Sequence, residues 1–498
     1  MIALDLAAVA SATGGRVHGD PATVVTGPVV TDSRLAEPGS LYVARIGEQA
    51  DGHAFVGGAA ARGAVAALTT REVADLPCVV VGEGAAPGES IQPADAALGR
   101  LARAVLDRLP QVVVVAVTGS VGKTGTKDLL GHVFATAGPT VAAEGSLNGE
   151  VGVPLTVLRA GPDTRYLVVE MGARGAGHIT HLTGVAPPRI GVVLNVGSAH
   201  LGEFGSREAT AVAKGELVAA LGPGGTAVLN ADDPLVAAMA GRVGPGVAVT
   251  AVGETGHIAG ASTVVRAQDV ELDGAARPSF VLAAGQVRAR VRLGLHGEHQ
   301  VPAALATAGA ALAAGLTVPA IAAALSTATA RSRWRMEVTE RSDGVTVVND
   351  AYNANPESMR AALKSLALMS RGRRSVAVLG EMLELGPDSA AEHDALGRLA
   401  VRLDVGRLVA VGDGARAVHL GATQEGSWAG ESVWVPDADA AWDHLQADLA
   451  AGDVVLVKSS NGAGLRFLGD RLAQVGAAGA GPAGPSGGGP AGPSGDFR

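Results

Sequence analysis

The chain of 498 residues contains a single cysteine, Cys78, and only five lysines among 39 basic residues. One cysteine excludes a disulfide framework and any zinc site built from several cysteines, and it indicates a reducing compartment. We therefore expect a cytoplasmic protein. Most basic residues of this chain are arginines, and lysine and arginine are not interchangeable at chemical sites. Each of the five lysines is therefore a weak candidate for a chemical role. They are Lys123, Lys127, Lys214, Lys364 and Lys458.

The chain also lacks a run of basic residues, and its net charge is −9. A nucleic-acid-binding protein normally carries a basic stripe, so we expect no nucleic-acid partner. The first residues, MIALDLAAVASATGG, contain no basic segment of the kind that opens a secretory signal, and none is expected. Residues 300–330 are uncharged, but this run is mostly alanine and contains Gly-Leu-Thr-Val-Pro. We read it as two helices joined by a turn and predict no membrane span.

What the sequence does contain is a series of short, β-branched apolar runs separated by helical patterns. This alternation predicts an α/β protein with parallel sheets. We expect a small α/β N-terminal domain over 1–85, a central doubly wound P-loop ATPase domain over 86–334, and a Rossmann-like domain over 335–475. Residues 476–498 hold 13 glycines and prolines in 23 positions and predict a disordered tail. The predicted strands are 112–117, 166–171, 190–195 and 226–230 in the central domain, and 345–350, 375–380, 407–412 and 453–458 in the third.

The first of these runs leads into TGSVGKTGTK, residues 118–127. Val117 stands where the strict phosphate-binding pattern has its first glycine, but a compact Gly-Ser-x-Gly-Lys-Thr turn between a strand and a helix remains. Backbone amides in such a turn bind phosphate, Lys123 reaches the β- and γ-phosphates, and the Thr124 hydroxyl can bind Mg²⁺. An ordinary glycine-rich turn would give the same local pattern without a ligand. The predicted nucleotide-binding residues of the loop are Gly119, Ser120, Val121, Gly122, Lys123, Thr124 and Gly125.

Three further residues could carry chemistry. Glu170 ends a predicted parallel strand, where a carboxylate faces the ligand crevice and can bind Mg²⁺. His200 follows the next strand and could equally be a simple loop residue. Lys214 lies on a helical pattern and, taken alone, reads as a surface lysine.

A GTPase or kinase is also compatible with the loop, although we find no guanine-recognition motif of the N/TKxD type.

Five segments together resemble the ATP-dependent Mur ligases of peptidoglycan synthesis, over about residues 1–470. TGSVGKT is similar to the short phosphate loop of that family, and residues 199–217 to its His and Lys region. The other similar segments are TDSRLAEPGSLYVARIGEQADGHAF (31–55), SRWRMEV (332–338) with VVNDAYNANPESM (347–359), and LGEMLELG (379–386). Within the family, these segments look like the member that adds D-alanyl-D-alanine to UDP-N-acetylmuramoyl-tripeptide.

The resemblance implies roles for most of these residues. Lys123, His200 and Lys214 would be catalytic, and Lys214 would be carbamylated, so that it helps Thr124, Glu170 and His200 bind Mg²⁺, with two ions expected. Arg335 and Asp350 would contact ATP. A monomer is expected. The residues expected to contact the two substrates are Asp32, Ser33, Arg34, Asn148, Asn353, Ser460 and Asn461.

The chain departs from the family at one place. His299-Gln300-Val301-Pro302 stands where the family usually has HNxxN, so no side-chain amide at position 302 can contact adenine. This departure is the only support for a non-catalytic nucleotide-binding homologue. The family also includes a diamino-acid-adding ligase, whose DNPR motif we do not find in this chain. A folylpolyglutamate-synthase-like ligase would share the loop and the middle domain, but it lacks the DSR-type first domain.

Overall fold

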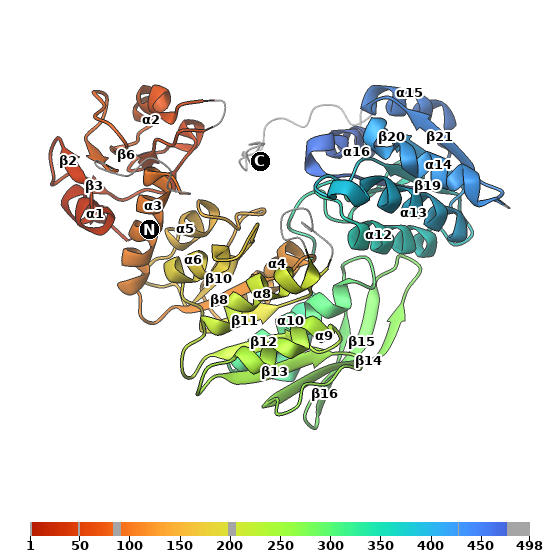
Figure 1. The fold of residues 1–498 in the computed structure, drawn as a ribbon, viewed down its shortest axis with the longest axis horizontal. Coiled ribbons are helices and arrows are strands. Elements are labelled where there is room, and N and C mark those ends of the chain that lie inside the picture. The colour runs from red at the N-terminus through yellow and green to blue at the C-terminus, as the bar shows by residue number, and fades with distance from the viewer. Residues whose placement is uncertain (1, 48–49, 83–90, 198–205, 427, 476–498) are drawn as a thin grey trace.

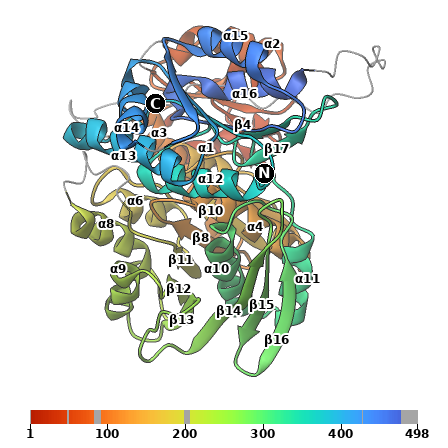
Figure 2. The ribbon, with the colours of Figure 1, turned by 90° about the vertical axis from the view of Figure 1, so that its right-hand side faces the viewer.

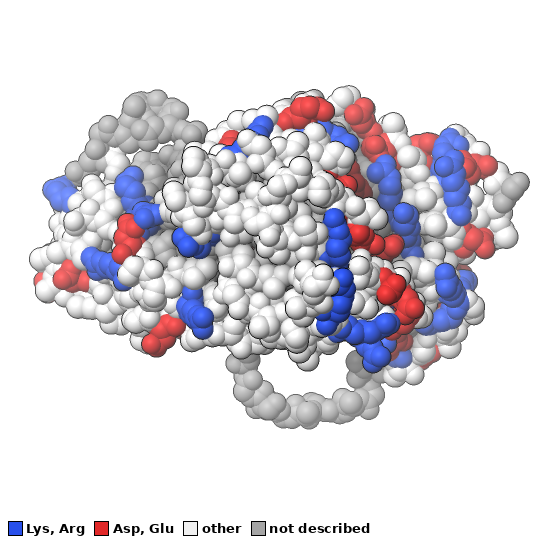
Figure 3. Space-filling model, turned by 90° about the horizontal axis from the view of Figure 1, so that it is seen from below, with Lys and Arg blue, Asp and Glu red and all other residues white. Residues whose placement is uncertain are grey.

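The computed structural model describes residues 2–47, 50–82, 91–197, 206–426 and 428–475. It has three lobes, each built around its own main sheet (Figure 1). The predicted tail, 476–498, and His200 lie outside the described residues. On the face seen in Figure 3, acidic and basic side chains are interspersed. No helix in the described ranges is long and apolar enough to cross a membrane.

The first lobe contains a five-stranded sheet in the order β2-β7-β6-β5-β4, with a small β1-β3 pair beside it. Strands β4 to β7 are parallel, and β2 is antiparallel to β7. One face of this sheet shares a hydrophobic core with helix α3 and with the central lobe. The elements are β1 (Leu4–Asp5), α1 (Leu6–Thr13), β2 (Arg16–His18), β3 (Val24–Val25), β4 (Val29–Val30), η1 (Ser33–Leu35), β5 (Leu41–Val43), η2 (Gly52–Phe55), α2 (Val56–Ala61), β6 (Ala66–Thr69), β7 (Cys78–Val80) and α3 (Pro93–Asp107).

The central lobe is a nine-stranded sheet in the order β16-β15-β14-β13-β12-β11-β8-β10-β9. Strands β8 to β14 run parallel, and β14, β15 and β16 form an antiparallel arm, visible at the bottom of Figure 2. The strands are β8 (Val113–Thr118), β9 (Thr140–Ala142), β10 (Tyr166–Glu170), β11 (Ile190–Val193), β12 (Thr226–Asn230), β13 (Ala248–Gly253), β14 (Thr263–Leu272), β15 (Pro278–Ala284) and β16 (Val287–Arg292).

Helices cover both faces of the central sheet, as the continuous apolar strands require. Val115 and Val117 of β8 pack with α4, α10 and α11, whereas Val114 and Ala116 of the same strand pack with α3, α5, α6 and α8. The turn at 314–317 separates α10 from α11, which confirms the predicted helix pair. The helices are α4 (Lys123–Ala135), α5 (Gly152–Val157), α6 (His178–Val185), α8 (Arg207–Ala219), α9 (Pro234–Ala237), η3 (Ala238–Arg242), α10 (Gln300–Ala313) and α11 (Val318–Ser326).

The third lobe is a six-stranded sheet in the order β17-β18-β22-β19-β20-β21, parallel except for β17. Helices α12, α13 and α14 cover one face, and α15 and α16 cover the other. The elements are β17 (Glu337–Glu340), β18 (Thr346–Asn349), α12 (Pro356–Met369), β19 (Ser375–Leu379), η4 (Gly386–Asp388), α13 (Ser389–Arg402), β20 (Arg407–Val411), η5 (Asp413–Ala415), α14 (Arg416–Glu425), β21 (Glu431–Val435), α15 (Ala438–Asp448), β22 (Val454–Lys458), η6 (Asn461–Ala463) and α16 (Leu465–Gln474).

Two of the contacts between the central and third lobes lie away from the phosphate loop. The first is the linker after α11, where the Ser332 amide donates to the Asp128 carboxylate of α4 at 3.2 Å. The second is the turn between β14 and β15. Its Ala276, with φ of 57°, is fully buried in the core of the third lobe. The central lobe therefore contributes a side chain to the third-lobe core.

The expected α/β class with three sheet-based lobes is confirmed. All eight predicted strands occur, with ends shifted by at most a few residues. The antiparallel arm was not predicted, because its strands are not continuous apolar runs. In β16, for example, the exposed arginines alternate with partly or fully buried residues.

Candidate functional site

The order of the central strands places a ligand crevice beside β8. The chain moves from β8 outward to β9 and β10 on one side, and then returns to β11 on the other. Ligands of doubly wound sheets bind at such a switch point, at the carboxyl ends of the strands. Here those ends carry the loop 119–122 after β8, Glu170 at the end of β10 and Asn195 just after β11.

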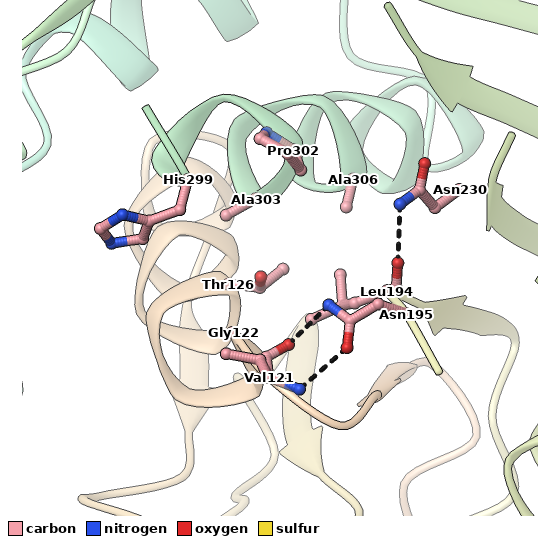
Figure 4. A pocket seen from close by; sticks show the side chains of 10 residues that line it. All are labelled: Val121, Gly122, Thr126, Leu194, Asn195, Asn230, His299, Pro302, Ala303 and Ala306. Carbon is pink, nitrogen blue, oxygen red and sulfur yellow. Dashed lines mark hydrogen bonds between the residues drawn. The ribbon is translucent and has the colours of Figure 1, made fainter. Parts of the chain in front are cut away.

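The position of loop 119–122 is fixed by hydrogen bonds to Asn195. The Asn195 side chain accepts from the Val121 amide at 2.9 Å and donates to the Val121 carbonyl at 3.0 Å (Figure 4). The Ser120 amide donates to the Asn195 carbonyl at 3.1 Å. The amides of Ser120 and Val121 are therefore already engaged, which narrows the predicted set of phosphate-binding amides. Gly122, with φ of 85°, adopts the left-handed conformation that favours glycine.

Helix α4 begins at Lys123, so the amides of Lys123, Thr124 and Gly125 lie in its first turn and have no acceptor within the helix. The Lys123 ammonium folds back onto the loop and donates to the Gly119 carbonyl at 2.8 Å and to the Ser120 carbonyl at 3.3 Å. Burial lowers the pKa of Lys123, while the nearby Glu170 carboxylate opposes this shift. These amides and this cation form a cradle for an anion at a helix N-terminus.

The Glu170 side chain is 1% exposed, and one of its oxygens, Oε1, accepts from the Asn148 amide at 2.8 Å. Its second oxygen, Oε2, is buried and has no hydrogen-bond partner among the described residues. A buried carboxylate oxygen without a partner is costly, and a hard cation such as Mg²⁺ would satisfy it. The Thr124 hydroxyl, 3.4 Å from the Ser146 hydroxyl, is the second oxygen available here. The donor set therefore fits Mg²⁺. Asn148 donates to Glu170 in this structure, and its predicted contact with substrate stays a prediction.

Lys214 is not the surface lysine that its helical pattern suggests. It lies on the inner side of α8 and is 3% exposed. Burial, together with the positive charge of Lys123 nearby, lowers its pKa to about 7. Near neutral pH a large part of this lysine therefore carries a neutral amine, the form that reacts with CO₂. His200, predicted to share this site, lies outside the described residues.

Arg335 extends from the start of the third lobe toward the loop. Its guanidinium donates to the Ser146 hydroxyl at 3.0 Å and stacks 4.3 Å from the centre of the Tyr352 ring. The Ser146 hydroxyl also lies 3.4 Å from that of Thr124, so Ser146 links Arg335 to this predicted metal ligand. Its Nε is buried and unpartnered among the described residues. An arginine in this position can bind phosphate, and its predicted contact with the nucleotide stays a prediction.

Asp350 is already engaged. One carboxylate oxygen accepts from the Met336 amide at 3.0 Å, and the other accepts from the buried Lys458 ammonium at 2.6 Å. Lys458 also donates to the carbonyls of Asp350 and Asn353. In this structure Asp350 therefore fixes the segment that carries Arg335, and its predicted contact with the nucleotide stays a prediction.

The remaining predicted substrate residues divide between the outer lobes. Asp32 caps the short helix η1 and pairs with the exposed Arg34 at 2.7 Å, with Ser33 between them. Ser460 is buried, and its hydroxyl accepts from the Leu383 amide at 2.9 Å. The Asn461 carbonyl accepts from Arg466, and the Asn353 side chain accepts from the Ala354 amide. The structure gives these residues local structural contacts and does not bring them to the phosphate loop.

Several residues that shape the site were not singled out from the sequence. Asn195 was detectable, because it is the last residue of a predicted strand at the switch point. Lys458 had a weaker signal: it is one of only five lysines, and it ends a predicted strand. Ser146 and Tyr352 had none, because their contacts with Arg335 join segments far apart in the chain.

Comparison with known proteins agrees with this geometry. Three family models match: the Mur ligase family catalytic domain over 28–105, the Mur ligase middle domain over 117–311 and the Mur ligase glutamate ligase domain over 334–461. The chain is 48% identical to the UDP-N-acetylmuramoyl-tripeptide–D-alanyl-D-alanine ligase of Mycobacterium tuberculosis H37Rv, covering 95% of this chain and 98% of that protein. It is 33% identical to the Escherichia coli K12 protein of the same name, with 84% and 88% covered.

Solved structures give the same result. A crystal structure of MurF from Acinetobacter baumannii superposes with a TM-score of 0.82 at 31% identity, covering 95% of this chain and 99% of that chain. MurF from Thermotoga maritima, solved in complex with ADP, gives a TM-score of 0.73 at 27% identity, with 90% and 98% covered. The chain therefore belongs to the Mur ligase family, whose members use ATP to form amide bonds.

Proposed function

We propose that this chain joins D-alanyl-D-alanine to UDP-N-acetylmuramoyl-tripeptide at the expense of ATP, acting as a cytoplasmic monomer. The names of its relatives and the similarity over nearly the whole chain support this specificity over that of a diamino-acid-adding or folylpolyglutamate-like ligase. The main structural support for a catalytic site is Glu170 Oε2, which has no partner among the described residues and lies near the Lys123 ammonium of the loop. A merely structural carboxylate would have both oxygens satisfied.

In the proposed reaction, the terminal carboxylate of the tripeptide attacks the γ-phosphorus of ATP, which gives an acyl phosphate and ADP. The amine of D-alanyl-D-alanine then attacks the acyl carbon. The tetrahedral intermediate loses inorganic phosphate and a proton, and the amide remains. Most of the catalytic effect of such transfers comes from positioning and from stabilising charge.

The chain's own residues have separate parts in this scheme. The amides of Lys123, Thr124 and Gly125 hold phosphate oxygens, and the Lys123 ammonium turns from the loop carbonyls toward the γ-phosphate. Arg335 approaches the same phosphate from the third lobe. Movement of that lobe toward the central one would exclude water from the acyl phosphate.

Mg²⁺ would be held by Thr124, Glu170 and carbamylated Lys214, with His200 as a further ligand to one of two ions, and would neutralise charge on the phosphate oxygens. The burial of Lys214 and its pKa of about 7 support the carbamate. A carbamate replaces a cation with an oxygen anion, which suits a hard metal ion.

The test is direct. The purified protein is mixed with ATP, MgCl₂, UDP-N-acetylmuramoyl-tripeptide and D-alanyl-D-alanine, and product is followed by mass spectrometry. We expect the pentapeptide product and one ADP per amide bond. ADP formation with a diamino acid or glutamate in place of the dipeptide, and none with the dipeptide, would reject the proposed specificity. No turnover with any acceptor would favour the non-catalytic homologue.

A further inference from the structure

A small cavity lies between helices α4 and α10, directly beside the phosphate loop. It is lined by Val121 and Gly122 of the loop, by Leu194, Asn195 and Asn230 at the ends of β11 and β12, by Thr126 of α4, and by His299, Pro302, Ala303 and Ala306 at the start of α10 (Figure 4). The walls are largely apolar, and Val121 and Gly122 of the phosphate loop form part of them. This is the composition expected of a pocket for a flat, partly apolar ligand group that is attached to phosphate.

The two asparagine side chains of this cavity are already engaged. Asn195 uses both ends of its amide on Val121. Asn230 donates to the Leu194 carbonyl at 2.8 Å and accepts from the Asp232 amide at 3.0 Å. Pro302 has no polar side-chain atom, and its place on α10 facing the cavity leaves that part of the wall without a hydrogen-bonding group.

Thr126 differs from these residues. Its side chain is fully buried, it projects from α4 toward α10, and its hydroxyl has no hydrogen-bond partner among the described residues (Figure 4). Most buried threonines on helices donate to a carbonyl one turn back, as Thr307 of α10 does to Ala303 at 2.8 Å. A buried hydroxyl without a partner is unfavourable, so its retention suggests that a ligand satisfies it.

We propose that the Thr126 hydroxyl binds the edge of the nucleotide's base and is a specificity-determining group of this site. The proposal rests on the nucleotide use in the proposed function. A hydroxyl can both donate and accept, so it can pair with an amino group or with a ring nitrogen of the base. The phosphates then occupy the amides of the α4 N-terminus, and the base lies against Pro302 and Ala303. The edge of the base is then read by a hydroxyl of α4, on the wall opposite Pro302.

The experiment compares Thr126→Val, which keeps the shape and removes the hydroxyl, with Thr126→Ser, which keeps the hydroxyl. Binding of ADP and of inorganic tripolyphosphate is measured by titration calorimetry, and melting temperature is recorded without ligand. The matched control is Thr307→Val, a buried threonine on the facing helix whose hydroxyl is already satisfied.

We expect Thr126→Val to weaken ADP binding about tenfold, the effect of one lost hydrogen bond, while tripolyphosphate binding is unchanged and the unliganded protein melts at or above the wild-type temperature. Thr126→Ser should bind ADP nearly as wild type does. Thr307→Val should melt lower and bind ADP normally.

Wild-type ADP affinity in a well-folded Thr126→Val protein would overturn the proposal. So would equal losses for ADP and tripolyphosphate, which would place the effect on the phosphate loop. Because the readout is nucleotide binding, a protein that binds ADP as expected but does not ligate D-alanyl-D-alanine would count against the proposed function and not against this assignment.

Discussion

The central and third lobes contribute to the site in opposite ways. In the central lobe, Glu170 Oε2 and the Thr126 hydroxyl are buried without partners among the described residues, and the first amides of α4 have no acceptor in the helix. In the third lobe, Asp350 and Ser460 are fully engaged by Lys458 and by backbone amides. The central lobe therefore offers groups to a ligand, whereas the third lobe mainly holds its own segments in place. Arg335 is the exception, since it extends to the central lobe and donates there to the Ser146 hydroxyl.

Replacing Lys123 should have the largest effect on activity, because it removes the cation of the phosphate loop in the central lobe. We expect Lys123→Met to lower the ligation rate at least about a hundredfold, since lost charge stabilisation of this kind costs several kcal/mol. The rate is measured by ADP release. The exposed Lys364→Met, on α12, is the control and should be fully active. A Lys123→Met protein that keeps more than a tenth of the wild-type rate would contradict the role assigned to the loop.

Variants of Lys214 test the central-lobe site through the protonation state of this lysine. We expect Lys214→Ala to lose most activity and short carboxylates such as acetate to restore part of it, while Lys214→Arg stays inactive because arginine cannot form the carbamate. The pKa of about 7 gives the sign of the pH effect. Above that pH the amine is neutral and can react with CO₂, and below it the ammonium cannot, so the wild-type rate should fall as pH drops through about 7.

The acetate-rescued Lys214→Ala protein should not show this fall, since it has no amine to protonate. Activity profiles from about pH 6 to 9 with bicarbonate present measure the difference. Full activity of Lys214→Arg, or an unmodified lysine mass under CO₂-replete, non-acidic conditions, would reject the carbamate.

Substitutions in the third lobe should change the free energy of unfolding more than the ligation rate. Lys458→Met leaves the largely buried Asp350 carboxylate without its cation, which should cost roughly 3 kcal/mol of unfolding free energy. The double variant Lys458→Met with Asp350→Asn should recover part of this loss, because the uncompensated charge is gone. Urea unfolding followed by circular dichroism measures both. Strictly additive losses would show that the pair does not act as a unit.

Ser460→Ala should have the smallest effect. Its hydroxyl accepts from the Leu383 amide, so its removal should cost about 1 kcal/mol of stability and leave the KM for D-alanyl-D-alanine within about twofold. A large rise in that KM with normal stability would instead support the substrate contact predicted for Ser460 from the sequence. It would also show that the third lobe receives ligand as the central lobe does.

Sequence reasoning worked best where local pattern and local structure coincide. The strands ending at Thr118, Glu170 and Val193 are continuous apolar runs, and the loop after the first follows from its own residues. The helical pattern alone suggested a surface position for Lys214, because α8 has apolar residues on several sides and the pattern does not reveal which side is covered. The family resemblance instead implied a site role, which agrees with its burial. Nor could it find that Ser146 bridges Thr124 and Arg335, since that contact depends on how two lobes meet.

The burial of Ala276 has a consequence for the order in which the protein can be made. This residue belongs to the turn between β14 and β15, yet it fills part of the core formed by α12 and the third sheet. A fragment beginning at residue 335 would lack it and would expose apolar surface at that place. During synthesis the turn emerges before the third lobe. The newly made third lobe therefore folds against a surface that is already present, and we expect it to be poorly expressed when cut away from the rest of the chain.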